Sequence, residues 1–390
     1  MRVMMIQHTP MVAGNAYLGL GVILARMGFA VELLGFTQAG KASSCSYVPG
    51  FVVRGLARPR ERGLPRVLLR AMHFFSYYRQ CVRRGRQLRP RVVVAFNYDS
   101  LFVASRIASL TGASVLYYVY EYSGWPTLRE VLSGWGIFKI LEKLRIGRAD
   151  YVASVEPVRA RLQARQWGFH EAIPVVLNCP LRDDPYGGTA RLHRSSEEVC
   201  RFVYTGALRA ESCIDEVIRA FIASDARVSL TLYGLVYPAF QERLDRLLCE
   251  AEEAGKKVRY GGLLPYAEVR KVLFEHDVGV CLYRGNRLNE RYCAPGKLYQ
   301  YLSAGLAVIV PDFRGMRNLL SRYEVGVAAS PTSVGSITEA VETLAGDRNG
   351  LRRMQESAVR AYETELNYEQ QSKPVVEWIL QQRPLQRVRC

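Results

Sequence analysis

A lysine and an amide side chain follow a Pro-Gly pair late in the chain, at a predicted helix start. Pro295 and Gly296 are typical of the opening of a helix, and apolar residues repeat after them at helical spacing. The first backbone amides of a helix have no intrahelical partner, and the helix dipole adds partial positive charge, so a helix start attracts anions. Lys297 lies in this first turn, and Gln300 follows on the same side. The pattern predicts a phosphate site, although an isolated run of this kind also suits an ordinary helix with a solvated lysine.

Further polar side chains follow predicted strands of the first half of the chain. Asn97 comes directly after a strand expected at residues 91–96, while Tyr120 and Glu121 end a strand expected at residues 113–120. Doubly wound sheets bind ligands at the carboxyl ends of their strands, so these three residues are candidates for binding a substrate. For Glu121 a helix-capping role is an equal alternative.

Alternating strands and helices predict two doubly wound α/β units. In the first half, strands are expected at residues 2–6, 30–34, 91–96, 113–120, 149–154 and 174–177. In the second half, they are expected at residues 201–205, 228–233, 258–260, 278–282 and 307–310. Residues 181–199 lose the apolar period and are predicted as a linker. The expected domains are therefore residues 1–180 and 200–365, followed by a terminal helix at 366–383 that is capped by Asn367 and kinked by Pro374.

The composition is that of a globular protein that works inside the cell. The chain has 390 residues, of which 49% are hydrophobic, and no apolar run approaches the length that crosses a bilayer. The start of the chain lacks the apolar region and cleavage site of a signal peptide. The nine cysteines are scattered without any Cys-x-x-Cys or Cys/His cluster. We therefore expect a cytoplasmic location, reduced thiols and no metal site.

Positive charge is concentrated in the segment from Arg54 to Arg91. The chain has a net charge of +17, and this segment holds twelve arginines against a single acidic residue, Glu61. Its apolar residues repeat at helical spacing, at Leu64, Leu68, Ala71, Phe75 and Tyr78. A basic amphipathic helix of this kind suits peripheral binding to an anionic membrane, and it equally suits a core-packed helix with a solvated arginine face. Nucleic acid is not expected as a partner, because the chain contains no nucleic-acid-binding module.

Residues 295–309, Pro-Gly-Lys-Leu-Tyr-Gln-Tyr-Leu-Ser-Ala-Gly-Leu-Ala-Val-Ile, resemble the donor-site segment of retaining glycosyltransferases of the GT-B fold. The family is the large sucrose-synthase-like one, that is, glycosyltransferase family four-like. There a glutamate at the position of Gln300 holds the ribose hydroxyls, and a second glutamate stands eight residues earlier, at the position of Tyr292. The donor-site motif is thus substituted in this chain, and the nearby Glu290 is a further candidate for binding the nucleotide sugar.

Three glycine-bearing loops resemble loops of the same family. Gly14 and Asn15 lie in a first loop, whose backbone approaches the donor in the family. Gly206 lies in Val-Tyr-Thr-Gly-Ala-Leu-Arg, which resembles the loop where an arginine and a lysine grip the diphosphate. In this loop Arg209 is the candidate replacement, with a solvated loop arginine as the alternative. Gly261 lies in a segment that resembles the loop that reads the nucleobase.

The resemblance implies two Rossmann-like domains that face each other across a cleft, with the C-terminal helix crossing back to the first domain. It also implies a retaining hexosyltransferase that moves a sugar from a nucleotide-diphosphate sugar to a glycan or lipid-linked acceptor, in polysaccharide or glycolipid biosynthesis. Lys297 and Arg209 would stabilise the departing diphosphate, and Glu121 would hold a hydroxyl of a substrate. In the family the leaving phosphate is thought to take the acceptor proton, so no protein base, metal or cofactor besides the donor is expected. Tyr120, where the family has a histidine, is compatible with such chemistry.

Two other functions fit the same fold. A catalytically weak homologue would serve as a sugar-nucleotide sensor or scaffold subunit, and the substituted positions, which include Ala207 and Ser212, favour this alternative. A nucleotide-sugar epimerase would need acid and base groups around the sugar, for which Glu121 and Glu290 are the evident carboxylates.

Overall fold

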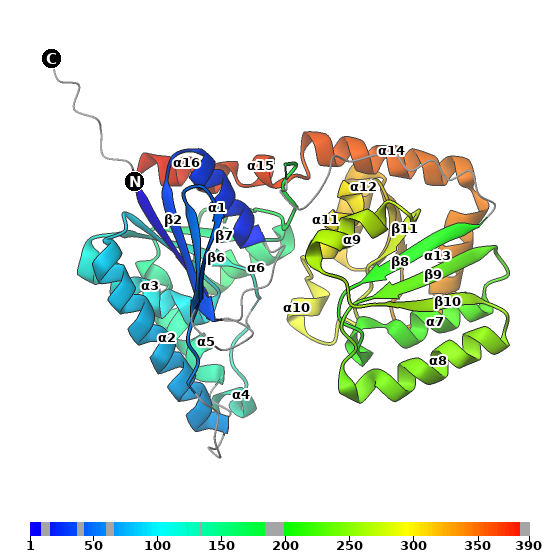
Figure 1. The fold of residues 1–390 in the computed structure, drawn as a ribbon, viewed down its shortest axis with the longest axis horizontal. Helices are drawn as coiled ribbons and strands as arrows, with labels where there is room; N and C mark the ends of the chain where they lie inside the picture. Colours follow the sequence, from blue (N-terminus) through cyan, green and yellow to red (C-terminus); the bar gives the residue numbers. More distant parts are fainter. Residues whose placement is uncertain are drawn as a thin grey trace. The chain divides into compact units, whose positions relative to one another are not determined.

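The chain divides into two compact units. The computed structural model describes residues 1–8, 16–36, 43–59, 66–122, 124–132, 135–183 and 199–382. Unit 1 consists of Met1–Leu177 and Gln371–Cys390, and unit 2 of Asn178–Gln370 (Figure 1). The first boundary therefore falls at residue 177, where 180 was expected, and the chain returns to unit 1 at residue 371. Gly14, Asn15 and most of the predicted linker lie outside the described residues.

The sheet of unit 1 has the strand order β3-β4-β2-β1-β5-β6-β7. Its strands are β1 (Arg2–Ile6), β2 (Ala30–Phe36), β3 (Ser43–Val48), β4 (Phe51–Leu56), β5 (Val92–Phe96), β6 (Ser114–Val119) and β7 (Tyr151–Ser154). All pairs are parallel except β3 with β4. From β4 onward the order is the doubly wound one, in which the direction of winding reverses between β1 and β5.

One predicted strand and one predicted kink are wrong. Residues 174–177 pair with β7 only through a single bridge at Ser154, whose amide donates to the Pro174 carbonyl and whose carbonyl accepts from the Val176 amide. The pairing ends there, since the amide of Leu177 donates to the Gln371 side chain at 3.3 Å. Pro374 does not kink a continuous helix. It lies in the first turn of a new helix, α16 (Lys373–Gln381), where its missing N–H costs nothing, and the preceding α15 (Tyr368–Gln371) ends separately.

The helices of unit 1 enclose a core on both sides of its sheet. They are α1 (Ala16–Arg26), α2 (Arg66–Leu88), α3 (Tyr98–Thr111), α4 (Leu128–Leu132), α5 (Trp135–Arg145), the short 3-10 turn η1 (Ile146–Arg148), α6 (Pro157–Trp167) and α16. α2, α3 and α5 lie side by side (Figure 1). α16 packs within unit 1, where Trp378 stacks on Tyr151 with ring centres 5.2 Å apart. The predicted return of the C-terminal helix to the first unit is therefore present.

The sheet of unit 2 is entirely parallel, in the order β10-β9-β8-β11-β12-β13. Its strands are β8 (Cys200–Thr205), β9 (Val228–Tyr233), β10 (Lys257–Gly262), β11 (Val278–Val280), β12 (Ala307–Pro311) and β13 (Gly326–Ala329). The winding reverses between β8 and β11. Ligands of such sheets bind at the carboxyl ends of the strands beside this reversal.

The helices of unit 2 pack against its sheet around a large apolar core. In chain order they are η2 (Ala210–Ser212), α7 (Ile214–Ala223), η3 (Pro238–Phe240), α8 (Gln241–Glu253), α9 (Tyr266–Leu273), α10 (Leu288–Arg291), α11 (Gly296–Ser303), α12 (Arg314–Tyr323), α13 (Val334–Gly346), α14 (Arg348–Thr364) and α15. In the described part of the chain, no helix is both long and apolar enough to cross a membrane. None of the eight described cysteines forms a disulfide bond.

Candidate functional site

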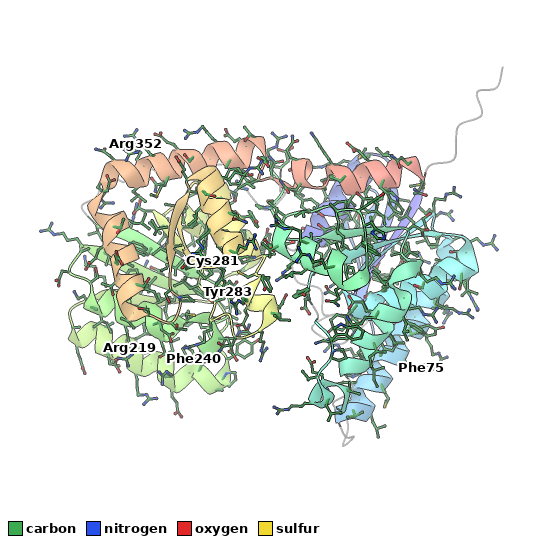
Figure 2. All side chains as sticks on the ribbon, turned by 180° about the vertical axis from the view of Figure 1, so that it is seen from behind. Phe75, Arg219, Phe240, Cys281, Tyr283 and Arg352 are labelled. Carbon is green, nitrogen blue, oxygen red and sulfur yellow. The ribbon has the colours of Figure 1, made fainter. Side chains whose placement is uncertain are left out.

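Lys297 lies in the first turn of α11, as predicted, and faces two aromatic rings. Its ammonium nitrogen is 3.9 Å from the ring centre of Tyr204 and 4.9 Å from that of Tyr283. Tyr204 belongs to β8. Tyr283, which is labelled in Figure 2, follows β11. The lysine therefore lies at the reversal of the winding, where the fold places ligands. Within residues 199–382, no carboxylate comes within ion-pair distance of Lys297.

The surroundings of Lys297 keep it charged. Burial on its own would lower the pKa of Lys297, but the oxygens of Tyr204 and Tyr283 raise this pKa well above its ordinary value. Since the lysine pKa is already far above neutral, the side chain is an ammonium ion at neutral pH. A half-buried cation without a carboxylate partner attracts an anion such as phosphate.

The glycine loop after β8 lies directly against Lys297. Gly206 has a φ of +139°, and a Cβ placed on it would be 3.6 Å from the Lys297 ammonium nitrogen. Its amide donates to the Tyr233 carbonyl at 2.9 Å, which links the ends of β8 and β9. The neighbouring Gly234 also has a positive φ, and a Cβ there would come within 1.8 Å of the Gly206 carbonyl oxygen. Gly206 and Lys297, which were both predicted to bind the donor, therefore lie next to each other in the structure.

Gly261 has a packing reason to be glycine. A Cβ at this position would lie 2.2 Å from the Tyr233 ring, in unit 2 at the end of β10. Its predicted role beside a nucleobase stays a prediction, because this contact explains the residue type without any ligand.

Arg209 is in the loop of Gly206 but is already engaged. Its Nε is 3.9 Å from a carboxylate oxygen of Glu211, and its guanidinium lies 5.7 Å from the ring centre of Tyr237. Arg284 fixes the same loop, since it donates to the carbonyl of Ala210 at 2.8 Å. Arg209 is a partly exposed residue in the loop of the proposed phosphate site. To bind a phosphate, its guanidinium would have to give up the long ion pair with Glu211.

The remaining donor-site candidates differ in their surroundings. Glu290, in α10, is 9% exposed, and its Oε2 has no hydrogen-bond partner among the described residues. Tyr292 ends α10, where its amide donates to Leu288. Gln300 lies one turn into α11 and is half-buried. An unpartnered buried carboxylate is costly, so Glu290 is the candidate that most needs a polar ligand such as a hydroxyl.

In unit 1 the structure brings the three predicted substrate-binding residues together. The side-chain oxygen of Asn97 accepts hydrogen bonds from the backbone amides of Tyr120 and Glu121, both at 3.0 Å. Asn97 has a φ of +64° and a ψ of 168°, a backbone conformation that is strained for any residue other than glycine. Arg159 fixes the same turn by donating to the Tyr120 carbonyl at 2.7 Å.

Glu121 does not cap a helix, so that alternative is wrong. Among the described residues the next helix begins at Leu128. Glu121 is an exposed residue, but neighbouring protein atoms remove part of the water from around its carboxylate. This desolvation and the negative charge of Asp99 raise the pKa of Glu121, and the positive charge of Arg159 lowers it in part. Glu121 is therefore available to accept a hydrogen bond from a substrate hydroxyl.

Sequence reasoning missed a histidine–aspartate pair at the same edge of the sheet. His8 Nδ1 is 3.1 Å from Asp99 Oδ2, and Nε2 of His8 is buried without a hydrogen-bond partner in the described part of the chain. The ring of Tyr77 lies 5.0 Å from that of His8. The signal was present, because His8 follows β1 and Asp99 follows β5, and these strands are adjacent.

Among the described residues, no group of three or more His, Cys, Asp or Glu side chains is arranged to hold a metal ion.

Comparison with known proteins identifies relatives of the fold. Residues 192–361, which lie within unit 2, match the sequence model of the family described as "Glycosyl transferases group 1". No curated protein sequence matches the chain. Sucrose-phosphate synthase from Thermosynechococcus elongatus superposes with a TM-score of 0.75 at 15% identity, covering 97% of this chain and 98% of that one.

Two further solved structures are similar over almost the whole chain. Anabaena HepE, in complex with UDP and glucose, has a TM-score of 0.72 at 12% identity and covers 98% of this chain and 100% of its own. WaaG, a glycosyltransferase involved in lipopolysaccharide biosynthesis, has a TM-score of 0.69 at 14% identity, with 95% of this chain and 98% of WaaG covered. These likenesses confirm the predicted α/β fold of two Rossmann-like domains, the GT-B fold.

Proposed function

We propose that the protein is a retaining glycosyltransferase that moves a hexose from a nucleotide-diphosphate sugar to a glycan or lipid-linked acceptor. The observation that carries the proposal is the position of Lys297. Its ammonium group stands at the start of α11 and against Gly206, with no carboxylate in ion-pair distance among the described residues. The match of residues 192–361 to the family "Glycosyl transferases group 1" supports the same assignment for unit 2.

The proposed chemistry concerns the departing diphosphate. When the bond between the sugar and the phosphate breaks, negative charge grows on the phosphate oxygens, and Lys297 with the first amides of α11 would stabilise that charge. Gly206 has no side chain, which leaves room for a phosphate beside the ammonium group. Arg209 would add a second cation after exchanging Glu211 for the phosphate. In this proposal protein cations carry the charge stabilisation, so the reaction is metal-independent and needs no cofactor.

On unit 1 we assign Asn97, Tyr120 and Glu121 to the acceptor. Asn97 fixes the backbone of the other two residues, and Glu121 offers a carboxylate to a hydroxyl. Donation of the acceptor proton to the leaving phosphate would complete a front-face transfer with retention. The proposal places the enzyme in the cytoplasm, in the synthesis of cell-surface polysaccharide or glycolipid.

A second candidate function is a sugar-nucleotide sensor or scaffold subunit. It is favoured by the ion pair of Arg209 with Glu211 and by Tyr292 and Gln300 at positions where the resembled family has glutamates. A protein of this kind would bind the nucleotide sugar and leave it intact.

One experiment separates these functions. The purified protein is incubated with a panel of nucleotide sugars, with UDP-glucose first because Anabaena HepE was solved in complex with it. Slow donor hydrolysis together with thermal stabilisation supports the transferase, and stabilisation without turnover supports the sensor. An isomerised donor would instead identify an epimerase. Retention is tested by the anomeric configuration of the product, and added chelator tests metal independence. The absence of both stabilisation and turnover with every donor would contradict the proposal.

A further inference from the structure

The apolar stripe of α2 faces solvent. Leu68, Met72 and Phe75 recur at helical spacing, and their side chains are 52%, 40% and 58% exposed (Figure 2 labels Phe75). The core contacts of the helix come from other positions, notably Tyr77 and Cys81, which are fully buried. A core-packed stripe with a solvated arginine face, one of the two predictions from the sequence, is therefore wrong for the first turns of α2.

A second exposed apolar stripe lies on α5. Ile137, Ile140 and Leu144 follow one another at helical spacing and are 51%, 38% and 72% exposed. Trp125 and Leu128, before and within α4, are 71% and 76% exposed. Among the described residues, nine of the sixteen exposed large hydrophobic side chains belong to α2, α4, α5 and the residue Trp125. This concentration marks an interaction surface, because isolated exposed hydrophobics would be spread over the molecule.

Side-chain contacts join these elements to one another. Phe74 of α2 packs on Phe138 of α5, with ring centres 4.7 Å apart. Lys139 of α5 binds Glu130 of α4 at 2.7 Å, and the ammonium group of Lys143 lies 4.0 Å from the ring centre of Trp125. We call this surface the α2–α5 face; its apolar residues are Val67, Leu68, Met72, Phe75, Trp125, Leu128, Ile137, Ile140 and Leu144.

The charges around the α2–α5 face are mainly positive. On α2 the exposed side beyond Phe75 continues with Arg79, Arg83 and Arg86, and the helix has no acidic residue. The acidic residues of α4 and α5 are occupied, since Glu130 is paired with Lys139 and Glu142 is buried against the hydroxyl of Tyr117. The arginines of the face therefore have no acidic partner on these three helices.

Two arginines of the basic segment form ion pairs within unit 1 and are not available to a partner. Arg54 and Arg84 both donate to the buried Glu32, at 2.6 Å. On α2, Arg79, Arg83 and Arg86 remain exposed for a partner.

We propose that the α2–α5 face docks on a lipid bilayer that contains anionic lipids. The apolar side chains would enter the boundary between headgroups and acyl chains, and the arginines would meet the lipid phosphates. A second copy of the chain is a less suitable partner for this face, because pairing two identical faces would place their arginines close together and the like charges would repel. An anionic bilayer can bind both the apolar side chains and the arginines, since its acyl chains lie beneath a negatively charged headgroup layer. This inference concerns unit 1 alone and does not depend on the chemistry proposed for Lys297.

The experiment is sedimentation with vesicles of phosphatidylcholine, with and without phosphatidylglycerol. The wild-type protein is expected to bind the vesicles with phosphatidylglycerol, and added salt is expected to weaken the binding. An apolar variant, Phe75→Ser with Leu144→Ser, and a charge variant, Arg79→Glu with Arg83→Glu, are each expected to lower the partition coefficient by about tenfold or more. All four positions are solvent-exposed or half-exposed by their place on the outer side of the helices, so the variants are expected to fold.

Matched controls carry the same chemical changes on unit 2. Leu263→Ser removes a side chain that is 66% exposed, and Arg219→Glu with Arg352→Glu reverses two exposed charges (Figure 2). These controls are expected to keep wild-type binding, and thermal unfolding of every variant reports its folding.

Three results would overturn the proposal: equal losses in the controls and in the α2–α5 variants, equal wild-type binding to both kinds of vesicle, or self-association through this face with no vesicle binding. A second measurement covers variants that fail to fold. Vesicles with brominated acyl chains are expected to quench the tryptophan fluorescence of the wild type, and the folded Trp125→Phe protein is expected to lose a large part of that quenching. Equal quenching in both proteins would contradict insertion of Trp125.

Discussion

The ammonium nitrogen of Lys297 lies 3.9 Å from the centre of the Tyr204 ring, and Tyr283 offers a second ring at 4.9 Å. An aromatic face attracts a cation without neutralising it, in contrast to a carboxylate. The two tyrosines therefore fix the direction of the side chain while its charge remains available to an anion. Since Tyr204 ends β8 and Tyr283 follows β11, the parallel sheet itself positions the cation.

Replacing the Tyr204 ring tests this arrangement. Tyr204→Leu is expected to weaken the binding of a nucleotide such as UDP by about twofold to thirtyfold, the range for a cation–π contact of about 0.5–2 kcal/mol. Tyr204→Phe keeps the ring and loses only the hydrogen bond to the Ala207 carbonyl, so its affinity should stay near that of the wild type. Titration calorimetry measures both. Equal affinities for the Leu and Phe variants would show that the ring does not position Lys297.

Asn97 positions the acceptor residues through its side-chain oxygen. Asn97→Ala removes the acceptor of two backbone amides and is expected to lower the free energy of unfolding by about 1–3 kcal/mol. If transferase activity is found, the variant should raise KM for the acceptor and leave slow donor hydrolysis unchanged, because the donor is assigned to unit 2.

The conservative variant decides whether the oxygen matters. Asn97→Asp keeps an acceptor at the same place, so it is expected to restore both stability and KM for the acceptor relative to Asn97→Ala. A KM as high in the Asp variant as in the Ala variant would argue against this positioning role.

Glu32 makes the stability of unit 1 dependent on pH. Burial on its own raises the pKa of Glu32, but the hydrogen bonds and charges of Arg84 and Arg54 prevail and lower it below its ordinary value. The ionised form is therefore favoured in the folded state. Its contribution to stability is complete above the unfolded-state pKa and is lost as the pH falls through the lower folded-state pKa.

Glu32→Gln is accordingly expected to lower the free energy of unfolding by about 2 kcal/mol at pH 7. The difference from the wild type should begin to shrink as the pH falls below about 4, where Glu32 of the unfolded chain becomes protonated, and should vanish below the lower folded-state pKa. Denaturant titrations at several pH values measure it. Glu268→Gln, which breaks an exposed pair with Lys271, is the control and should change stability little. A constant difference down to pH 3 would contradict the linkage.

Much of the fold could be predicted from the sequence, because most strands are buried and appear in the sequence as short apolar runs. The five strands predicted for unit 2 appear as β8 to β12 near their expected ranges, and α11 begins at the predicted Pro-Gly pair, while β13 was not predicted. The hairpin of β3 and β4 was missed because β3, Ser-Ser-Cys-Ser-Tyr-Val, is an exposed edge strand without apolar alternation. At residues 174–177 an apolar run predicted a strand, but the pairing with β7 stops after one bridge, at Ser154.

The candidate site was predictable only in part, for a related reason. Lys297 and Gly206 were found because a helix start and a glycine loop have local signals. The tyrosine pair around Lys297 depends on contacts between residues far apart in the chain, which no spacing rule encodes. The pairing of His8 with Asp99 could be inferred only from the adjacency of β1 and β5. The exposure of the apolar stripe of α2 could not be predicted either, because an amphipathic pattern does not show which side of the helix faces solvent.

The most direct test of the account is the stabilisation that a nucleotide gives to the Lys297→Ala protein. In the wild type, UDP or a UDP-sugar is expected to raise the unfolding temperature, because a ligand that binds the native state stabilises it. Lys271→Ala, which removes a lysine that is 71% exposed on the same unit, should keep that increase. The account predicts that Lys297→Ala folds and loses the increase at the same ligand concentration. An increase equal to that of the wild type would contradict the phosphate site at the start of α11.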